Sequence, residues 1–420
     1  MEKTPKSMRV QIGLFGRTNV GKSSFLNMIA GQDIAITSPI PGTTTDVVEK
    51  AMELLPIGPV VFLDTAGTDD ISELGAERLR KTEKTFDRAD VFVLIAEPDR
   101  WLSFEETILA EAQKRNTPVV VVVNKIDTTP LSKDVAQNIL RATRCCKVVS
   151  VGDGERNRYI TDFKQCLSEA LPEELVQTPT LVGDLVPPGQ LAVLIIPIDL
   201  QAPKGRLILP QVQTIRDALD NDAATLIVKE REYAHMLTQL RNPPAVSICD
   251  SQVVMKMVAD TPPHIPCTTF SILFARFKGD LIEEAKGAAA IEGLKQGDRV
   301  LIAEACSHHA AEDDIGRVKI PRWLRQYVGC ELEIDVVSGR DYPDNLADYS
   351  VVIHCGACML TRREMLSRIH RAGDAGVPVT NYGVCISFLQ GVLERVLTPF
   401  PAALQAYRDK MTRLTSGSIV

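Results

Sequence analysis

The stretch Val10–Ser23, V-Q-I-G-L-F-G-R-T-N-V-G-K-S, decides the fold of the first part of this chain. It joins the apolar run Val10–Phe15 to a loop that matches the phosphate-binding pattern G-x-x-x-x-G-K-[ST]. This pattern is informative when it follows a strand and opens a helix, and Lys22–Ala30 has the periodicity of that helix. We therefore predict an α/β domain that binds the phosphates of a nucleotide.

Short apolar runs and amphipathic stretches alternate from this loop to about Leu171. Such alternation predicts right-handed crossovers and a mainly parallel sheet that is covered on both faces. The predicted strands are Val10–Phe15, Val60–Leu63, Val91–Ile95 and Val119–Val123, and the predicted helices are Lys22–Ala30, Ser72–Phe86 and Phe104–Arg115.

The loop itself supplies most of the predicted nucleotide contacts. Its backbone N–H groups and the following helix N-terminus attract phosphate oxygens. Lys22 would reach the β- and γ-phosphates, and the Ser23 hydroxyl would bind Mg²⁺. The predicted binding residues of the loop are Gly16, Asn19, Val20, Gly21, Lys22, Ser23 and Ser24.

Two later segments complete the predicted nucleotide site. Asp64-Thr65-Ala66-Gly67 follows a predicted strand, so that Asp64 would support Mg²⁺ and the Gly67 N–H would meet the γ-phosphate. Asn124-Lys125-Ile126-Asp127 follows the valine run. The Asp127 carboxylate can accept from both N1–H and the exocyclic amine of guanine, an edge that adenine lacks. We therefore predict a GTP site in which Asn124, Lys125 and Asp127 contact the base.

These segments resemble the translation-factor-like small GTPases over roughly the first 170 residues. Pro41–Asp46 resembles the first switch of GTPases that act in tRNA modification and ribosome assembly, which implies that Thr44 closes over Mg²⁺ and the γ-phosphate. Asn19 matches members of that group that K⁺ activates, where K⁺ replaces an arginine finger; the alternative is that Asn19 only shapes the loop. By this resemblance the catalytic residues are Lys22, Thr44, Asp64 and Gly67.

The segment after Gly67 departs from Ras-type enzymes. Those enzymes carry a glutamine that orients the attacking water, whereas this chain has Thr68-Asp69-Asp70. We therefore expect slow intrinsic hydrolysis. Asp69, Asp70 and Glu77 are the candidates for positioning water.

Composition limits the remaining alternatives. A 420-residue chain with 45% hydrophobic and 24% charged residues predicts two or three domains. The net charge of −7 and the lack of a basic–aromatic patch argue against nucleic acid as a partner. No apolar run is long enough for a bilayer and no signal peptide is visible, so we expect a cytoplasmic protein with no membrane attachment. Its ten cysteines are then expected to be thiols or metal ligands.

Further α/β patterns predict a division into residues 1–172, 173–270 and 271–420. The middle block shows no polar cluster like a site, which favours a structural or interface role. Its predicted strands are Leu191–Ile196, Ala224–Val228 and Ala245–Ile248, and its predicted helices are Val212–Leu219, Tyr233–Leu240 and Val253–Val258. The last block has predicted strands at Asp298–Ile302, Leu332–Val337 and Val351–Ile353, and predicted helices at Leu281–Leu294, Thr361–Ala372 and Val384–Val396.

Cysteines and histidines gather in the last block, just after two of its predicted strands. Cys306-Ser307-His308 stands upstream of His354-Cys355-Gly356-Ala357-Cys358. Two thiolates in a C-x-x-C turn suit either zinc or an iron–sulfur cluster. From spacing alone, a closed Cys/His zinc site and a cubane held by three cysteines both remain open.

The order C-x-H, a long gap and H-C-x-x-C, behind a GTPase half with Asn19, resembles the FeFe-hydrogenase maturation GTPases, the HydF family. The resemblance covers nearly the whole chain and implies a GTPase domain, a dimerisation domain and a 4Fe-4S cluster domain. It implies a homodimeric scaffold that receives a diiron (2Fe) precursor from two radical-SAM maturases and delivers it to apo FeFe-hydrogenase. Carried over by position, Cys306, Cys355 and Cys358 bind the cluster. His308 and His354 are candidates for the fourth ligand, with His309 and Glu304 nearby.

Two other functions compete with this hypothesis. One is a potassium-dependent GTPase of tRNA modification or ribosome assembly with a structural zinc module at its C-terminus. The other is a binding module whose closed zinc site only stabilises the last block. Metal and sulfide analysis separates both from an iron–sulfur scaffold.

Overall fold

The computed structural model describes residues 9–30, 48–64, 83, 85–150, 154–172, 180–197, 207–305, 314–339 and 342–417. The chain forms two compact units, Met1–Thr178 and Pro179–Val420. The predicted boundary between residues 270 and 271 lies inside the second unit, in the first turn of a helix. Within the described parts of the chain, every helix is too short or too polar to span a bilayer.

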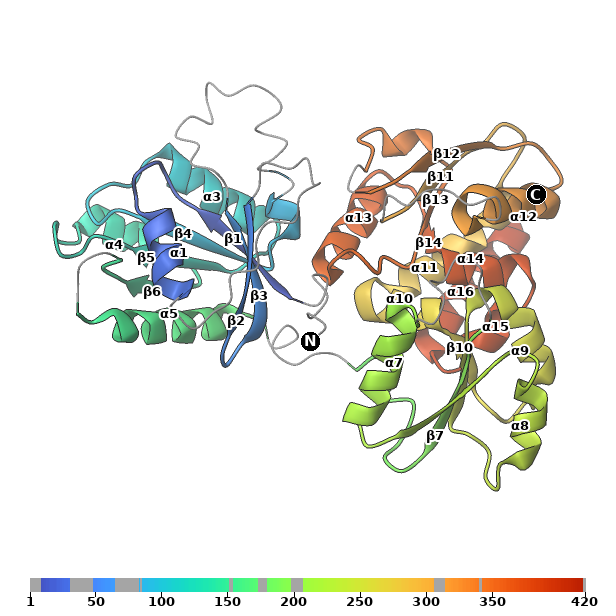
Figure 1. Cartoon of the computed structure of the whole chain (residues 1–420). Helices are drawn as coiled ribbons and strands as arrows, with labels where there is room; N and C mark the ends of the chain where they lie inside the picture. Colours follow the sequence, from blue (N-terminus) through green and yellow to red (C-terminus); the bar gives the residue numbers. More distant parts are fainter. Residues whose placement is uncertain are drawn as a thin grey trace. The chain divides into compact units, whose positions relative to one another are not determined.

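The first unit is built on a six-stranded sheet of order β2-β3-β1-β4-β5-β6 (Figure 1). All neighbours are parallel except β2, which is antiparallel to β3. The strands are β1 (Val10–Phe15), β2 (Val48–Leu54), β3 (Gly58–Asp64), β4 (Val91–Ala96), β5 (Val119–Val123) and β6 (Arg144–Lys147).

Helices cover both faces of this sheet, as the sequence predicts. The reason is visible in β5, whose five valines are all buried and point alternately to opposite faces. One face packs on α1 (Lys22–Ala30) and α5 (Arg156–Ala170), and the other packs on α3 (Ser103–Lys114) and α4 (Lys133–Ile139). The predicted helix Ser72–Phe86 lies largely outside the described residues.

The second unit contains two four-stranded sheets, β10-β9-β7-β8 and β12-β11-β13-β14, and every strand pair in them is parallel. Read from opposite ends, the two sheets have the same strand order, with the first strand of each set in an inner position. The strands are β7 (Leu191–Ile195), β8 (Ala224–Val228), β9 (Val246–Cys249), β10 (Cys267–Thr269), β11 (Arg299–Ala303), β12 (Glu333–Val337), β13 (Val351–His354) and β14 (Val379–Asn381).

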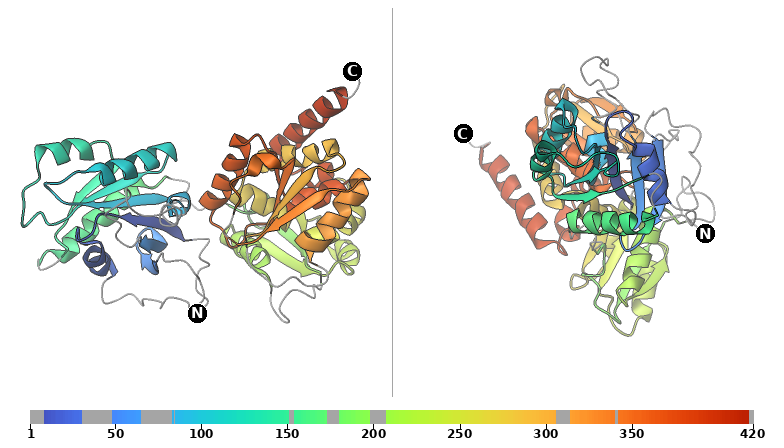
Figure 2. Two further views of the ribbon diagram at one scale, coloured as in Figure 1. Left: turned by 90° about the horizontal axis from the view of Figure 1, so that it is seen from above. Right: turned by 90° about the vertical axis from the view of Figure 1, so that its left-hand side faces the viewer.

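One hydrophobic core joins the two sheets of this unit. Ile248 of β9, Leu273 of α10 and Ile302 of β11 all belong to it. The C-terminal helix extends from this core toward the end of the chain (Figure 2). The helices are α7 (Leu209–Asp220), α8 (Tyr233–Gln239), α9 (Val254–Asp260), α10 (Phe270–Lys278), α11 (Leu281–Ala289), α12 (Ile320–Val328), α13 (Arg362–Asp374), α14 (Tyr382–Leu389), α15 (Leu393–Val396) and α16 (Pro401–Gly417).

Two local features explain how the helices of this unit lie. Gly287 brings α11 directly against β14, since a Cβ atom there would lie 1.9 Å from the carbonyl oxygen of Val379. The predicted single helix Val384–Val396 is wrong: it is two helices, α14 and α15, separated by a turn at Gly391, whose φ is +71°.

Candidate functional site

The phosphate-binding loop follows β1 and leads into α1. In the sheet, β1 lies between β3 and β4, so the loop emerges where the chain connections run to opposite sides, the usual ligand position in such sheets. Lys22 Nζ donates to the carbonyl oxygens of Gly16 (2.5 Å) and Arg17 (2.8 Å). Gly21 has φ +98°, and a Cβ atom there would lie 2.2 Å from Nδ2 of Asn124. The loop therefore closes around its own lysine and requires glycine next to Asn124.

The segment that the sequence assigns to the guanine base packs against this loop. Asn124 Nδ2 donates to the carbonyl oxygen of Val20 (2.8 Å), and its Oδ1 accepts from the backbone N–H of Ser150 (3.2 Å). Lys125 Nζ donates to the carbonyl oxygen of Asn19 (2.7 Å). Asp127 is exposed. Asn124 and Lys125 thus bind the backbone of the phosphate loop. The Asp127 carboxylate stays exposed at the surface.

Four side chains, at the phosphate-binding loop and at the end of β3, bear on metal binding. Asp64 ends β3, and burial raises the pKa of its carboxyl, an effect that Lys50 and Lys22 oppose. Ser23 and Asn19 are exposed, and Ser24 is half-buried. These residues offer hydroxyl, amide and carboxylate oxygens beside Lys22, which suits Mg²⁺. Thr44 and Gly67 lie outside the described residues.

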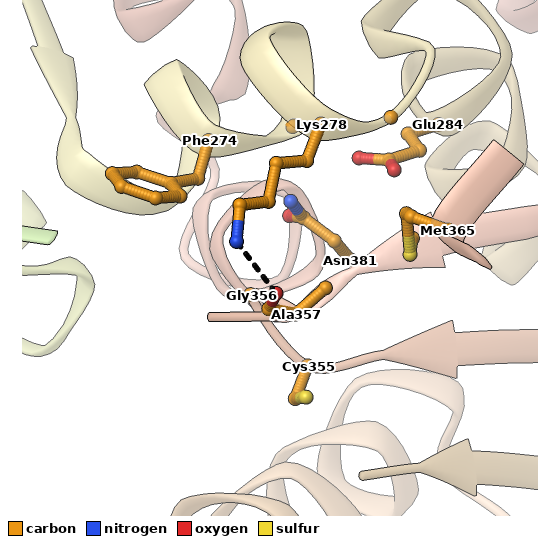
Figure 3. Close-up of a pocket in the computed structure, with 10 residues that line it drawn as sticks. Phe274, Lys278, Glu284, Cys355, Gly356, Ala357, Met365 and Asn381 are labelled. Atoms are coloured by element: carbon orange, nitrogen blue, oxygen red, sulfur yellow. Dashed lines mark hydrogen bonds between the residues drawn. The ribbon is translucent and has the colours of Figure 1, made fainter. Parts of the chain in front are cut away.

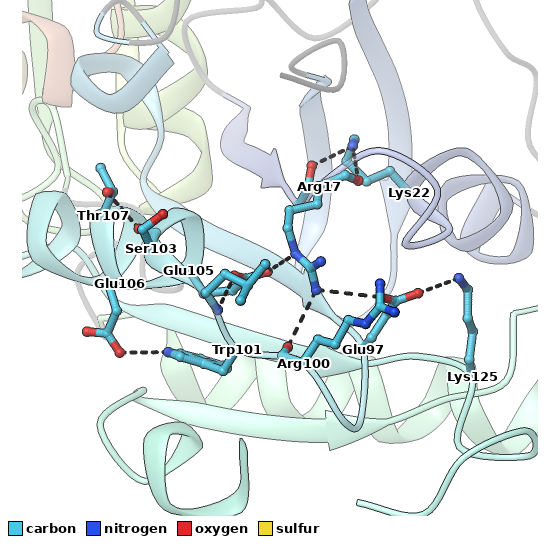
Figure 4. A network of polar contacts seen from close by, with 12 residues as sticks. Arg17, Lys22, Glu97, Arg100, Trp101, Ser103, Glu105, Glu106, Thr107 and Lys125 are labelled. Carbon is cyan, nitrogen blue, oxygen red and sulfur yellow. Dashed lines mark hydrogen bonds and ion pairs between the residues drawn. The ribbon is translucent and has the colours of Figure 1, made fainter. Parts of the chain in front are cut away.

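A carboxylate that the sequence did not single out connects the phosphate loop to the base segment (Figure 4). Glu97, just after β4, pairs with Lys125 Nζ (2.7 Å) and with the guanidinium of Arg17 (3.5 Å). Arg17 also donates through Nε to Glu105 of α3 (2.7 Å), whose side chain is fully buried. Nothing in the local pattern distinguishes Glu97 or Glu105 from ordinary surface acids, so sequence reasoning had no signal for them.

The cysteine region lies at the carboxyl edge of the sheet β12-β11-β13-β14. The first strand, β11, lies between β12 and β13, so its junction with β13 is the switch point where ligands bind in parallel sheets. The backbone N–H of Ala305, which precedes Cys306 in the chain, donates to Sγ of Cys355 (3.0 Å). Cys306, His308 and His309 themselves lie outside the described residues.

Cys355 and Cys358 belong to a tight turn that a buried lysine holds (Figure 3). Ala357, between them, has φ +51°. Lys278 Nζ donates to the carbonyl oxygens of Ala357 (3.2 Å), Cys358 (3.2 Å) and Leu360 (2.9 Å). Burial lowers the pKa of Lys278 to about 8, and the Cys358 sulfur, the Glu364 carboxylate and the Cys355 sulfur oppose this change.

His354, predicted as a candidate ligand, is fully buried and engaged through both ring nitrogens. Nδ1 contacts the carbonyl oxygen of Cys355 (2.9 Å), and Nε2 contacts the guanidinium of Arg368 (2.9 Å). Burial and Arg368 lower the pKa of His354 to about 3, so the imidazole is neutral. Because both ring nitrogens are engaged by protein groups, neither is available to bind a metal in this conformation.

Glu304, the other described neighbour, is also engaged. Its carboxylate receives hydrogen bonds from Arg317 (3.1 Å from Nη2) and from the Tyr382 hydroxyl (3.4 Å). Burial raises the pKa of Tyr382, and the nearby Cys355 sulfur and Glu304 carboxylate add to the effect. Both oxygens of the Glu304 carboxylate are thus already engaged by protein donors.

The described side chains fit an anionic, thiolate-ligated group. The Ala305 N–H points at one sulfur and the Lys278 ammonium lies beside the turn, and both favour thiolate over thiol. Among the described residues, no group of three or more His, Cys, Asp or Glu side chains could hold a metal ion. A third thiolate would have to come from outside them, as the sequence predicts for Cys306.

The remaining cysteines are free thiols. Burial raises the pKa of Cys249 and Cys385, which fits inert core residues. Cys146 and Cys166 form a thiol pair between β6 and α5, and the hydrogen bond from Cys146 lowers the pKa of Cys166 to about 7.

Three family models match separate stretches of the chain between residues 11 and 399. Residues 11–125 match the family described as 50S ribosome-binding GTPase. Residues 181–279 match the Hydrogen maturase F dimerization domain, and residues 282–399 match the Hydrogen maturase F tetramerization domain.

Individual relatives match the GTPase part alone. A tRNA modification GTPase MnmE of Synechococcus sp. (strain JA-3-3Ab) is 43% identical over 129 residues, 30% of this chain and 27% of that protein. GTPase Der of Persephonella marina is 37% identical over 148 residues, 34% of this chain and 33% of that protein. This chain therefore spans about a quarter to a third of the length of these curated relatives.

Solved structures with a similar GTPase part include the G domain of the T. maritima FeoB iron transporter, with 20% identity and a TM-score of 0.29 over 37% of this chain and 98% of that one. Era bound to MgGDPNP and 16S ribosomal RNA has 19% identity and a TM-score of 0.31 over 52% of this chain and 91% of that one.

The fold and the two sites define a P-loop GTPase domain followed by two parallel α/β sheets with a cysteine turn at a switch point. Both segments of the second unit match domains of one family, Hydrogen maturase F. The chain belongs to the hydrogen maturase F family.

Proposed function

We propose that this chain is a GTP-hydrolysing scaffold that binds a 4Fe-4S cluster and passes a diiron precursor to an apo FeFe-hydrogenase. The cluster would be held by Cys306, Cys355 and Cys358. When bound, it would supply a redox-active iron site with one exchangeable position, which is a suitable place to attach and release an incoming diiron cargo.

One observation carries this proposal: the Ala305 N–H lies 3.0 Å from Sγ of Cys355, at the switch point of a parallel sheet. Ala305 directly precedes Cys306 in the chain, which supports ligands from both cysteine segments at this edge. The same chain carries a complete phosphate loop and guanine segment. A zinc ribbon would instead use two C-x-x-C knuckles, and the chain has one.

The GTPase half would act through Mg²⁺ and K⁺. Lys22 would bind the β- and γ-phosphates, Ser23 and Thr44 would bind Mg²⁺, and Asp64 would orient its water ligands. Asn19 would bind K⁺, because its exposed side chain forms no hydrogen bond within the described residues. Nucleotide state would bias the docking of partner proteins through the segments Thr43–Asp46 and Asp64–Asp70.

Partners follow from the matched families. The domain names imply self-association, which we propose proceeds through a homodimer. Radical-SAM maturases would supply the diiron precursor, and apo FeFe-hydrogenase would accept it. The relatives named for tRNA modification match only the GTPase part, so no observation on the second unit favours an RNA substrate.

Metal analysis of the full chain tests the proposal. After anaerobic reconstitution we expect about four iron and four sulfide per chain. Cys355→Ser should remove the cluster and leave GTP turnover intact, because the cysteine and the nucleotide site lie in different units. Cys330→Ser, which changes a half-buried thiol after α12, is the matched control and should keep the cluster. Stoichiometric zinc without sulfide would overturn the scaffold and support the zinc-module alternative.

A further inference from the structure

We propose that Lys278 is a positioning residue for the cluster: its ammonium holds the Cys355–Leu360 turn in the ligating conformation and places a positive charge beside the thiolates. This inference rests on the proposed function. Lys278 is the last residue of α10 and lies within the segment that matches the dimerisation domain, while the cysteines lie in the segment that matches the tetramerisation domain. A residue of one segment thus completes the site of the other.

The first argument is geometric. Lys278 is only 2% exposed, and its three hydrogen bonds all go to backbone carbonyls of one turn, those of Ala357, Cys358 and Leu360. An ammonium has three N–H donors, so this turn uses all of them. Ala357 has φ +51°, a conformation that alanine adopts reluctantly. The lysine therefore stabilises a turn that its own sequence does not favour.

The second argument is electrostatic. A buried charge normally has an opposite charge beside it, because burying it alone costs much free energy. Within the described residues no carboxylate forms an ion pair with Lys278. The groups whose charge favours its ammonium are, in order, the Cys358 sulfur, the Glu364 carboxylate and the Cys355 sulfur. Thiolates that ligate a cluster would provide the missing counter-charge.

The third argument is that α10 is fixed on both sides of the lysine. Arg362, which opens α13 just after the cysteine turn, donates to the carbonyl oxygen of Phe277 (2.8 Å). Gly279 follows, and a Cβ atom there would lie 2.5 Å from the Glu284 carboxylate. Lys278 thus donates from α10 to the cysteine turn, and Arg362 donates from the start of α13 back to α10. The end of α10 therefore fixes the position of the turn.

Lys278→Met and Lys278→Gln in the full chain separate the two roles. Methionine removes the donors and the charge, whereas glutamine keeps two N–H donors and removes the charge. Lys286→Met is the control, since Lys286 is half-buried on α11 and forms its ion pair with Glu283. In cluster-free protein, we expect the amides of residues 357–360 to exchange with deuterium roughly ten- to a hundredfold faster in Lys278→Met than in the wild type.

In reconstituted protein, we expect Lys278→Met to lose most of its iron and sulfide. Lys278→Gln should retain a larger share, with the cluster reduction potential shifted to more negative values, since a nearby positive charge favours the reduced state. A merely structural residue would not shift the potential. If the wild type binds a cluster and both variants match Lys286→Met in exchange, iron content and potential, the role of Lys278 is overturned. If the wild type binds no cluster, the proposed function fails, whatever Lys278 does.

Discussion

The guanidinium of Arg368 donates a 2.9 Å hydrogen bond to Nε2 of His354. Arginine can only donate, so Nε2 must be the acceptor and the proton must lie on Nδ1, which donates to the carbonyl oxygen of Cys355. The tautomer of His354, the residue before Cys355, is thereby fixed by protein partners. His354 thus holds the backbone at Cys355, and this role does not require contact with iron.

His354→Ala should therefore destabilise the second unit without changing the cluster. Removing the ring leaves a cavity and a buried guanidinium with one fewer partner, so we expect the free energy of unfolding to fall by roughly 2–4 kcal/mol. Iron per folded chain and the spectrum of the reduced cluster should equal those of His370→Ala, a control at an exposed position. A changed spectrum in folded His354→Ala would show that the histidine ligates iron after all.

Glu284 predicts an unusual dependence of stability on pH. It is fully buried, neither carboxyl oxygen has a hydrogen-bond partner among the described residues, and burial raises its pKa well above 4.5. The folded state keeps this proton while the unfolded state loses it, so stability is present below about pH 4.5 and falls as pH rises. In denaturant unfolding, the free energy of unfolding of Glu284→Gln should rise relative to that of the wild type. The expected rise is about 1.4 kcal/mol for each pH unit above that point.

The control for Glu284 is Glu283→Gln, one residue earlier on α11, where the side chain is exposed and pairs with Lys286. That variant should follow the wild-type pH profile. Parallel profiles for all three proteins would mean that Glu284 is ionised in the folded state.

Glu97→Gln should accelerate GDP release. The carboxylate pairs with Lys125 of the guanine segment and Arg17 of the phosphate loop, and all three side chains are at least partly shielded. Losing this bridge should cost about 1 kcal/mol, a several-fold higher dissociation rate of a fluorescent GDP analogue. Glu106→Gln, which breaks exposed contacts of α3 with Trp101 and Arg141, should leave the rate unchanged. Equal rates for the two variants would remove Glu97 from the nucleotide site.

Asn19 predicts a cation dependence of GTP hydrolysis. If its amide oxygen helps to bind K⁺, kcat in KCl should exceed kcat in NaCl by an order of magnitude or more. Asn19→Ala should abolish that difference while retaining GDP binding, because only the backbone carbonyl of Asn19 contacts Lys125. A kcat that is the same in both salts would leave Asn19 as a loop former, a role that its φ of +63° also suits.

The sequence predicted most accurately the strands whose residues are all buried. Val119–Val123 is buried on both faces and was identified to the residue, as was Val10–Phe15. The edge strand β2 was missed, because its Glu49, Lys50 and Glu53 break the apolar run. Helix α10 was missed for the opposite reason: it is apolar nearly all round, so it has no polar face to reveal a helical period.

The candidate sites divide along the same line. Motif residues such as Lys22, Asn124 and Cys355 could be predicted as candidates, because each belongs to a short motif with a recognisable spacing. Lys278, Glu284 and Glu97 were not, since their roles arise from burial and from contacts between segments far apart in the chain. Nothing in a local window distinguishes a lysine that clamps a turn from one that faces water.

The single core shared by the two sheets of the second unit limits how this protein could be rearranged. The two matched segments, 181–279 and 282–399, have separate family names, yet α10 and α11 bury residues that serve both. Replacing one segment by that of a distant relative would replace only half of the shared core and only half of the residues around the cysteines. Viable chimaeras should therefore exchange residues 181–417 as one piece, because α16 also packs into this core, with the GTPase unit as the separately exchangeable module.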